Sequence, residues 1–191
     1  QSEAIRQQYL DLGVPEENIH TWGNIKYALE GLSDIALSQA EKRKKQWLAG
    51  QKGPVLVGVS THEGEEAILL ESYKTLRKKM PHCKLVLIPR FIARTESIVG
   101  LVKNSNLTAT LHTQQGSPAS DPVHIVDAIG QVMGYLAMAD VAFIGGSLVE
   151  RGGHNPLEAA KLGVPCLTGP HTKNFTSVWE DLAKLGAHKK V

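Results

Sequence analysis

The sequence is poor in cysteine, in aromatic residues and in long apolar runs, and each shortage excludes a class of protein. Two cysteines, Cys83 and Cys166, occur in 191 residues, and 5% of the residues are aromatic. Both cysteines lie in or beside apolar runs, so we expect buried free thiols rather than a disulfide, which fits a reducing compartment. Two cysteines also argue against a structural zinc site. No apolar run approaches the ~20 residues that a membrane-spanning helix needs.

The chain also lacks a strong excess of charge. Its formal net charge is +2, with 42% hydrophobic and 21% charged residues, the composition of an ordinary globular domain. Nothing in the overall charge therefore points to nucleic acid as a partner. Basic residues do cluster locally, at 42–45, 74–79 and 189–190. Such runs are usually the solvated face of a helix, and the alternative is attraction to an anionic membrane surface.

The first residues carry no sign of a signal peptide, because the chain opens Gln-Ser-Glu without a charged and then apolar start. The chain has no initiator Met and begins inside a predicted helix, so we expect a fragment of a longer protein. A chain of 191 residues can bury one good core, and we expect a single domain over 1–191.

Several catalytic signatures are missing. The glycines follow neither Gly-x-Gly-x-x-Gly after a first strand nor the P-loop pattern, which argues against a dinucleotide dehydrogenase and a P-loop ATPase. Ser60 and Ser147 lack the Gly-x-Ser-x-Gly elbow of the α/β-hydrolases. No His-Glu-x-x-His spacing occurs, so we expect no metal site.

What the sequence does contain is an alternation of strand-like and helix-like segments. Predicted strands cover 54–59, 84–88, 108–111, 124–126, 141–144 and 165–167, and a short one opens the segment 18–27. Predicted helices cover 3–12, 35–49, 64–80, 95–104, 127–138 and 176–185, with loops at 114–122 and 169–175. This alternation indicates repeated βαβ units and therefore a Rossmann-like α/β fold with a doubly wound parallel sheet.

Polar residues gather where the predicted strands end. These segments are 60–62, 89–90, 127–131, 145–147 and 169–174. In an open parallel sheet, ligands bind beyond the carboxyl ends of the strands. The coincidence predicts a ligand site at this edge of the sheet.

The run 139–160 carries the strongest local signal. Its strand, 141–144, ends at Gly145 and Gly146, and a second glycine pair follows at 152–153. A glycine turn between a strand and a helix can cradle phosphate, because free backbone amides converge there. Arg151 and His154, which such a turn does not require, favour a ligand site.

The helix after this turn has three start signals. Asn155 suits the N-cap, Pro156 the first helical position, and Glu158 completes the spacing of a capping box. The alternative is that these residues only cap the helix.

Other charged side chains at the strand ends have two interpretations each. The guanidinium of Arg90 suits phosphate or carboxylate, and the alternative is an ion pair with a nearby carboxylate. His62 and His171 could donate to a sugar or a phosphate, or could simply be surface histidines. Glu63, Glu65 and Glu66 complement the dipole of the helix that they open and would repel an anion, so we expect hydroxyl groups there.

Taken together, the segments 60–66, 89–90, 145–160 and 169–175 closely resemble the C-terminal half of the Kdo (3-deoxy-D-manno-octulosonic acid) transferases of lipopolysaccharide biosynthesis. The segment Gly23–Tyr27 resembles the Gly-Asn-Leu-Lys-Phe segment of that family. The resemblance extends from about residue 18 to the end of the chain.

The resemblance implies the nucleotide-sugar-binding domain of a two-domain, B-type glycosyltransferase. Such an enzyme moves Kdo from CMP-Kdo to a lipid A precursor at the cytoplasmic face of the bacterial inner membrane, without a cofactor. The carboxylate that activates the acceptor lies in the family's N-terminal domain, which is absent here. We therefore expect the partner of this fragment to be its own N-terminal domain, and no catalytic residue within the fragment.

By motif match, the CMP site would comprise Pro89, Arg90, Ile129, Gly130, Gln131, Asn155, Pro156, Leu157 and Glu158. The residues nearer the phosphate or the Kdo moiety would be Lys26, Ser60, Thr61, His62, Gly145, Gly146, Ser147 and His171. Glu158 would bond the ribose hydroxyls while still capping its helix. Phe91 stands where the family usually has His, and Gln131 where it often has Glu, so only backbone contacts are expected at Gln131.

Two other functions stay open at this point. One is a sugar-nucleotide epimerase on the same two-domain scaffold, which would bind UDP. The other is a non-catalytic interaction module whose basic helices bind a membrane surface.

Overall fold

Two compact units make up the chain, residues 1–31 and 32–191. The computed structural model describes residues 3–23, 28, 31–114 and 121–191. The first unit holds helix α1 (Glu3–Asp11) and the 3-10 helix η1 (Glu16–Asn18). No strand is found in 18–23, contrary to the prediction, because this segment pairs with no strand in the described part of the chain. The buried apolar side chains of the described residues all lie in the second unit, so the domain predicted over 1–191 has its core in 32–191.

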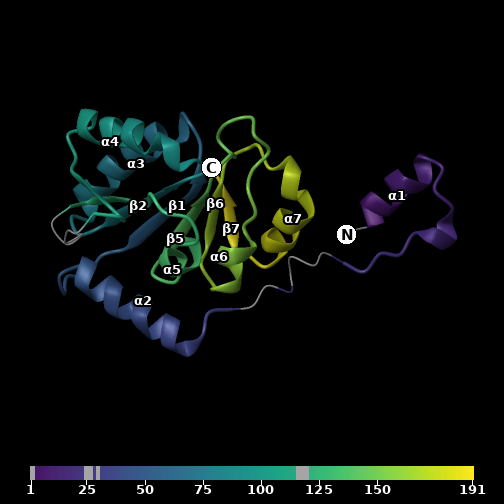
Figure 1. Ribbon diagram of the computed structural model, residues 1–191, viewed down its shortest axis with the longest axis horizontal. Helices are drawn as coiled ribbons and strands as arrows, with labels where there is room; N and C mark the ends of the chain where they lie inside the picture. Colours follow the sequence, from purple (N-terminus) through teal and green to yellow (C-terminus); the bar gives the residue numbers. More distant parts are fainter. Residues whose placement is uncertain (1–2, 24–27, 29–30, 115–120) are drawn as a thin grey trace. The chain divides into compact units, whose positions relative to one another are not determined.

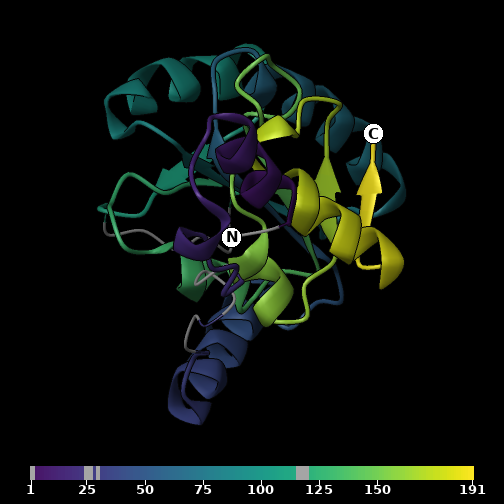
Figure 2. The same ribbon diagram turned by 90° about the vertical axis from the view of Figure 1, so that its right-hand side faces the viewer.

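A parallel sheet of seven strands forms the centre of the second unit, with the order β3-β4-β2-β1-β5-β6-β7. All six pairings are parallel, which confirms the predicted doubly wound α/β fold. Figure 2 shows β6 and β7 as arrows that point the same way beside helix α7. The strands are β1 (Val55–Thr61), β2 (Lys84–Pro89), β3 (Ala109–Leu111), β4 (Val123–Ile125), β5 (Val141–Ile144), β6 (Cys166–Thr168) and β7 (His188–Lys190).

Helices cover both faces of the sheet. Right-handed crossovers that run toward β3 place α3 and α4 on one face, and those that run toward β7 place α5, α6 and α7 on the other. Figure 1 shows α3 and α4 together on one side of the strands, with α5 and α6 on the opposite side. None of the helices in the described ranges is long and apolar enough to cross a bilayer. The helices are α2 (Asp34–Trp47), α3 (Glu65–Lys79), α4 (Thr95–Asn104), α5 (Val132–Leu136), α6 (Leu157–Lys161) and α7 (Thr176–Lys184), with 3-10 helices η3 (Ile92–Arg94) and η4 (Lys173–Phe175).

The core between the sheet and the α3–α4 layer is built from alternate strand residues. Leu85 and Leu87 of β2 point to this side and pack with Leu70 of α3 and Ile98 of α4, all with at most 2% of their surface exposed. Strands that are buried on both faces have continuous apolar sequences, and for this reason their positions could be predicted from the sequence.

Both cysteines are free and buried, as predicted. Burial raises the pKa of each thiol, Cys83 and Cys166, to about 12, so neither is a reactive thiolate at neutral pH.

Two elements differ from the prediction. Helix α5 begins at Val132 rather than at Asp127, because Gly130 has a φ of +80°, which breaks a right-handed helix. The basic run at 189–190 belongs to the edge strand β7, which pairs with β6. Its two lysines are exposed, as charged residues on an edge strand often are.

The strand order reverses direction between β1 and β5. The chain runs from β1 outward to β2, and later from β4 back to β5, on the other side of β1. In open α/β sheets a crevice forms at such a switch point, outside the carboxyl ends of the strands. The tips of β1 and β5 therefore flank the position where this fold binds ligands.

One buried carboxylate holds these two tips together. The side chain of Glu65, the first residue of α3, is fully buried and accepts four backbone hydrogen bonds at 2.8–3.0 Å. The donors are the amides of His62, after β1, and of Gly146, Ser147 and Leu148, after β5. Hydrogen bonds to an ionised acceptor are about twice as strong as neutral ones, so Glu65 fixes the geometry of this edge.

A cluster of rings joins helices α2 and α5 to the sheet. His124 of β4, 6% exposed, lies 2.8 Å from the hydroxyl of Thr110 and 2.8 Å from that of Tyr135. The ring of Trp47 packs edge-on against it, with centroids 4.6 Å apart. Burial, with a smaller contribution from the neighbouring His112, lowers the pKa of His124 to about 4.

We expect Glu65→Gln to lower the free energy of unfolding by about 2 to 4 kcal/mol, because the amide presents an NH₂ group to backbone donors and removes the charge. Urea denaturation at pH 7 measures this. The matched control is Glu63→Gln, the same substitution on an exposed side chain two residues earlier, expected to change stability by less than about 0.5 kcal/mol. Equal losses in the two variants would contradict the role given to Glu65.

Acid should destabilise the fold through His124. Its folded pKa of about 4 lies below the ordinary 6.5, so the unfolded chain binds more protons between these values. The contribution of His124 to the free energy of unfolding is complete above pH 6.5 and is lost as the pH falls toward 4. About 2 kcal/mol of this free energy is lost by pH 5. Urea denaturation of the native chain and of His124→Gln at pH 7 and 5 tests this, since the variant should lose less on acidification. The same loss in both would refute it.

Candidate functional site

The predicted polar segments come together along one edge of the sheet. Because the strands are parallel, their carboxyl ends share an edge, and five neighbouring strands, in the order β4, β2, β1, β5 and β6, each end in one such segment. The sheet order therefore confirms the predicted grouping of these segments. Lys26 is the exception, because it lies outside the described residues.

The turn after β5 does not offer the free amides that the sequence predicted. The amide of Gly145 donates to the oxygen of Val59 at 2.8 Å, and those of Gly146 and Ser147 donate to Glu65. The hydroxyl of Ser147 is also engaged, because it donates to one backbone oxygen and accepts from one backbone amide. A carboxylate that reaches across from α3 occupies this cradle, so its amides are not available to a phosphate.

The tip of β1 is held in an unusual conformation. Ser60 has a φ of +53°, in the left-handed region that residues other than glycine rarely adopt. A side chain at Gly145 would come within 2.3 Å of the Ser60 oxygen, which is why glycine is required there. The hydroxyl of Thr61 is buried without a hydrogen-bond partner among the described residues. Backbone strain and an unpartnered polar atom at one position are typical of functional sites.

His62 faces His154, a residue that the sequence analysis did not assign to the site by motif match. Their Nε2 atoms lie 2.7 Å apart, and the two rings are coplanar within 1°. Burial lowers the pKa of both imidazoles below the usual range, and in His154 the neighbouring His62 lowers it further. The two rings thus form a hydrogen-bonded pair across the switch point.

Arg90 is exposed at the tip of β2 and has no ion-pair partner among the described residues. Its guanidinium carbon lies 5.8 Å from the centre of the Phe91 ring, a cation–π contact. The nearby carboxylate of Glu66 pairs instead with Arg94, with N–O distances of 2.7 and 3.0 Å. The ion pair that was the alternative for Arg90 is therefore absent from the described structure, and its charge faces solvent.

The turn after β4 presents backbone groups and an exposed apolar side chain. Ile129 is 87% exposed, and neither its amide nor that of Gly130 donates to any described residue. The side-chain nitrogen of Gln131 lies 3.5 Å from the oxygen of Ile129, a marginal contact. A turn of this kind can read the edge of a planar base through its backbone.

The start of α6 combines a cap with a free carboxylate. The side-chain oxygen of Asn155 accepts from the amide of Leu157 at 3.2 Å, a capping contact, although Pro156 rather than Asn155 occupies the N-cap position of α6. Pro156 precedes the helix, and Leu157 is buried. The return bond expected from Glu158 is absent, because this carboxylate bonds no described residue. Burial alone raises its pKa, so Glu158 is a half-buried acceptor without a donor.

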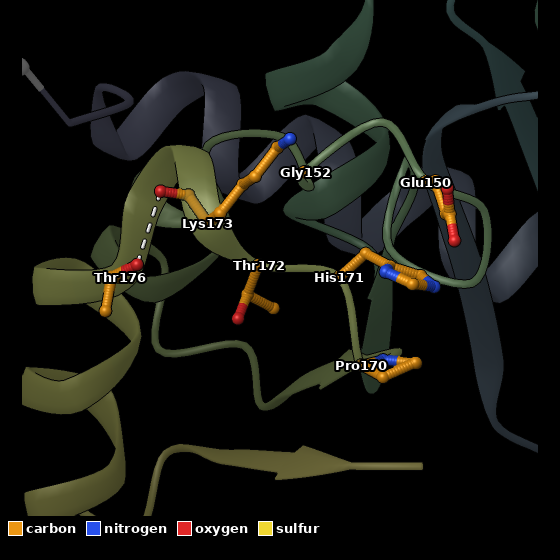
Figure 3. A pocket seen from close by; sticks show the side chains of 7 residues that line it. All are labelled: Glu150, Gly152, Pro170, His171, Thr172, Lys173 and Thr176. Carbon is orange, nitrogen blue, oxygen red and sulfur yellow. Dashed lines mark hydrogen bonds between the residues drawn. The ribbon is translucent and has the colours of Figure 1, made fainter.

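A polar pocket of about 390 Å³ opens beside the tips of β5 and β6. Figure 3 shows Glu150 and His171 at one end of it, Lys173 and Thr176 at the other, and Thr172 between them. The backbone of His171 is fixed by a hydrogen bond from its amide to the oxygen of Ser147 at 2.9 Å. Hydroxyl, imidazole, ammonium and carboxylate groups in one pocket suit a ligand rich in hydroxyl groups.

Part of this pocket was predicted from the sequence. His171 had been singled out, and Thr172 and Lys173 lie in the polar segment 169–174 that was predicted to face a ligand at a strand end. Glu150 and Thr176 had not been assigned to the site. Within the described part of the chain, no group of three or more His, Cys, Asp or Glu side chains is arranged to hold a metal ion.

Comparison with known proteins gives a consistent result. No family model matches the chain. The chain is 34% identical over 186 residues to a 3-deoxy-D-manno-octulosonic acid transferase of Haemophilus influenzae, a match that covers 97% of this chain and 43% of that protein. A transferase of the same description from Chlamydophila psittaci is 33% identical over 98% of this chain and 42% of its own length. The chain thus spans less than half the length of these relatives.

A solved structure matches the fold as well. The C-terminal CMP-Kdo binding domain of WaaA from Acinetobacter baumannii superposes with a TM-score of 0.76 at 29% identity, over 83% of each chain. This likeness of fold agrees with the sequence similarity. The chain resembles part of the Kdo transferases in sequence, and the C-terminal CMP-Kdo binding domain of WaaA in fold.

Proposed function

We propose that this chain is the donor-binding part of a glycosyltransferase that moves Kdo from CMP-Kdo to a lipid A precursor in lipopolysaccharide biosynthesis. One observation carries the proposal. The polar groups left unpaired at the strand tips are a guanidinium at Arg90, a carboxylate at Glu158 and amides at Ile129 and Gly130. A nucleoside monophosphate needs a cation for its phosphate, an acceptor for its ribose hydroxyls and backbone groups for its base.

The cytidine half of the donor is assigned to the tips of β4 and β2 and to the start of α6. The ribose hydroxyls would donate to Glu158, which now lacks a donor. The phosphate would meet Arg90, whose planar guanidinium binds two oxygens at once. The base would lie against the 129–131 turn, where exposed Ile129 offers an apolar surface. The relative from Acinetobacter baumannii, described as binding CMP-Kdo, supports this assignment.

The sugar half of the donor is assigned to the polar pocket of Figure 3. Its hydroxyls and its ammonium group, from Thr172, Thr176 and Lys173, suit a hydroxylated sugar acid better than they suit a base. The pocket lies after β5 and β6, while Arg90 and the 129–131 turn lie after β2 and β4. A donor bound in this way would span the switch point.

In the proposed reaction the acceptor hydroxyl attacks the anomeric carbon of Kdo while the bond from that carbon to the phosphate oxygen breaks. Arg90 stabilises the charge that grows on the leaving CMP, which is electrostatic catalysis. Glu65 and Glu66 are engaged with amides and with Arg94, so neither is free to act as a general base. The base, the acceptor site and the expected inner-membrane location are assigned to the rest of the protein, and no metal or cofactor is required.

A role at an anionic membrane surface stays a prediction for the basic helices. Part of the run on α2 is already engaged, since Lys44 donates to both oxygens of Asp140 at 2.7 Å. Lys78 and Lys79 at the end of α3 are exposed. The module without enzymatic function and the UDP-dependent epimerase have no observation in their favour beyond these charges and the shared fold. Titration with CMP and with UDP separates the epimerase from the transferase.

We expect Arg90→Ala to weaken CMP binding about 10- to 100-fold, because the phosphate loses a charge-assisted hydrogen-bond partner. Isothermal titration calorimetry measures this, with cytidine as the matched ligand whose affinity should not change. Lys103→Ala, which removes one exposed positive charge near the end of α4, is the control variant. Unchanged CMP affinity in Arg90→Ala would remove Arg90 from the site.

Glu158→Gln should weaken CMP binding about tenfold, since hydroxyl donors bind a carboxylate more strongly than an amide. Cytidine 2′,3′-dideoxy 5′-monophosphate lacks the two hydroxyls, so it should bind the native chain and the variant equally. The same calorimetric titration, with both ligands on both proteins, isolates the ribose contact. A loss of equal size for both ligands would show that Glu158 acts on the fold rather than on the ribose.

A further inference from the structure

The hydrogen bond between His62 and His154 allows only one proton in the space between the rings. Their Nε2 atoms lie 2.7 Å apart in coplanar rings. An imidazole nitrogen either donates or accepts, so this bond needs one N–H and one lone pair. If both rings were cations, two N–H groups would face each other and the bond could not form.

Burial of the pair favours its neutral form while no ligand is bound, and charges of both signs surround it. The charged groups that act on the two rings are Glu65 and Glu66 of α3, Arg90 after β2, Arg94 of η3 and Arg151 after β5. Both carboxylates are already engaged, Glu65 with four amides and Glu66 with Arg94. Burial is the main cause that holds the pKa of each imidazole below its usual range, and the arginines add to it while the carboxylates oppose it.

The pair lies directly on the proposed donor site. The ring of Phe91 meets His62 edge-on, with centroids 5.8 Å apart, and carries Arg90 at 5.8 Å. A side chain at Gly146 would come within 3.1 Å of His154, so the turn after β5 packs against that ring. Neither Nδ1 atom bonds a described residue, so each ring keeps one polar edge for a ligand.

We propose that binding of an anionic nucleotide donor adds one proton from solvent to the His62–His154 pair, at the Nδ1 atom that carries none, so that the Nε2–H···Nε2 bond is kept and both imidazoles donate through Nδ1 to anionic groups of the donor. The proposal rests on the proposed function, because it needs a phosphate or a sugar carboxylate beside Arg90. An opposite charge within about 4–6 Å raises a histidine pKa by roughly 1–3 units. An anion bound beside the rings therefore favours the protonated pair.

Calorimetry in buffers of different ionisation enthalpy counts the protons taken up on binding. The ligand is a methyl phosphodiester of cytidine 5′-monophosphate, because a monoester has its own ionisation near pH 6 that would confuse the count. At pH 7 we expect uptake approaching about one proton per ligand, with affinity rising by up to about tenfold for each unit of decreasing pH.

Two variants test where the proton goes. The double substitution His62→Gln and His154→Gln should abolish the uptake and flatten the pH dependence of affinity. His82→Gln, which removes an exposed histidine at the opposite edge of the sheet, should leave the uptake unchanged. Uptake that persists in the double variant, or its absence in the native chain that binds the ligand, would overturn the inference.

The outcomes separate this inference from the proposed function. If the native chain binds no cytidine phosphate at any pH, the proposed function fails and the inference with it. If the double variant does not fold, NMR of the native chain replaces it: the assigned Hε1 resonances of His62 and His154 should move toward cationic values when ligand is added at constant pH. Resonances that stay at neutral values would refute proton uptake.

Discussion

The structure depends on one buried carboxylate at the point where the strand order reverses. Parallel strands that diverge there leave backbone amides without partners, and a buried amide without a partner costs free energy comparable to a lost hydrogen bond. Glu65 accepts hydrogen bonds from four of these amides. It turns a glycine-rich loop, which could have cradled phosphate, into a rigid support, and the groups that remain for a ligand lie on its flanks.

Pairing of carboxylates inside the protein explains how an anion could approach a segment that contains Glu63, Glu65 and Glu66. The sequence suggested repulsion, yet two of these carboxylates are compensated inside the protein, by amides and by Arg94. Arg90 has no such compensation among the described residues and faces solvent beside Phe91. Internal pairing of two carboxylates therefore leaves a net positive tip on β2, which suits the phosphate of the proposed donor.

The similarity to Kdo transferases and the geometry of the strand tips both support the proposed role of this chain in donor binding. The chain spans less than half of its curated relatives, and the carboxylate at its switch point, Glu65, is engaged with amides. The proposed donor-binding role, with the acceptor activated by another part of the protein, agrees with both facts. In the proposed proton uptake, binding of the anionic donor and protonation of the His62–His154 pair favour each other.

The sequence by itself determined the elements and the edge at which they would bind a ligand. Local hydrophobic patterns located β5 at 141–144 and the capping contact of Asn155, because these depend on neighbours along the chain. Tertiary structure alone decided the partners of Glu65, 81 residues from Gly146, and of His62, 92 residues from His154. It also placed the edge strand β7 beside β6. Strand order brings such distant residues together, and no local pattern specifies that order.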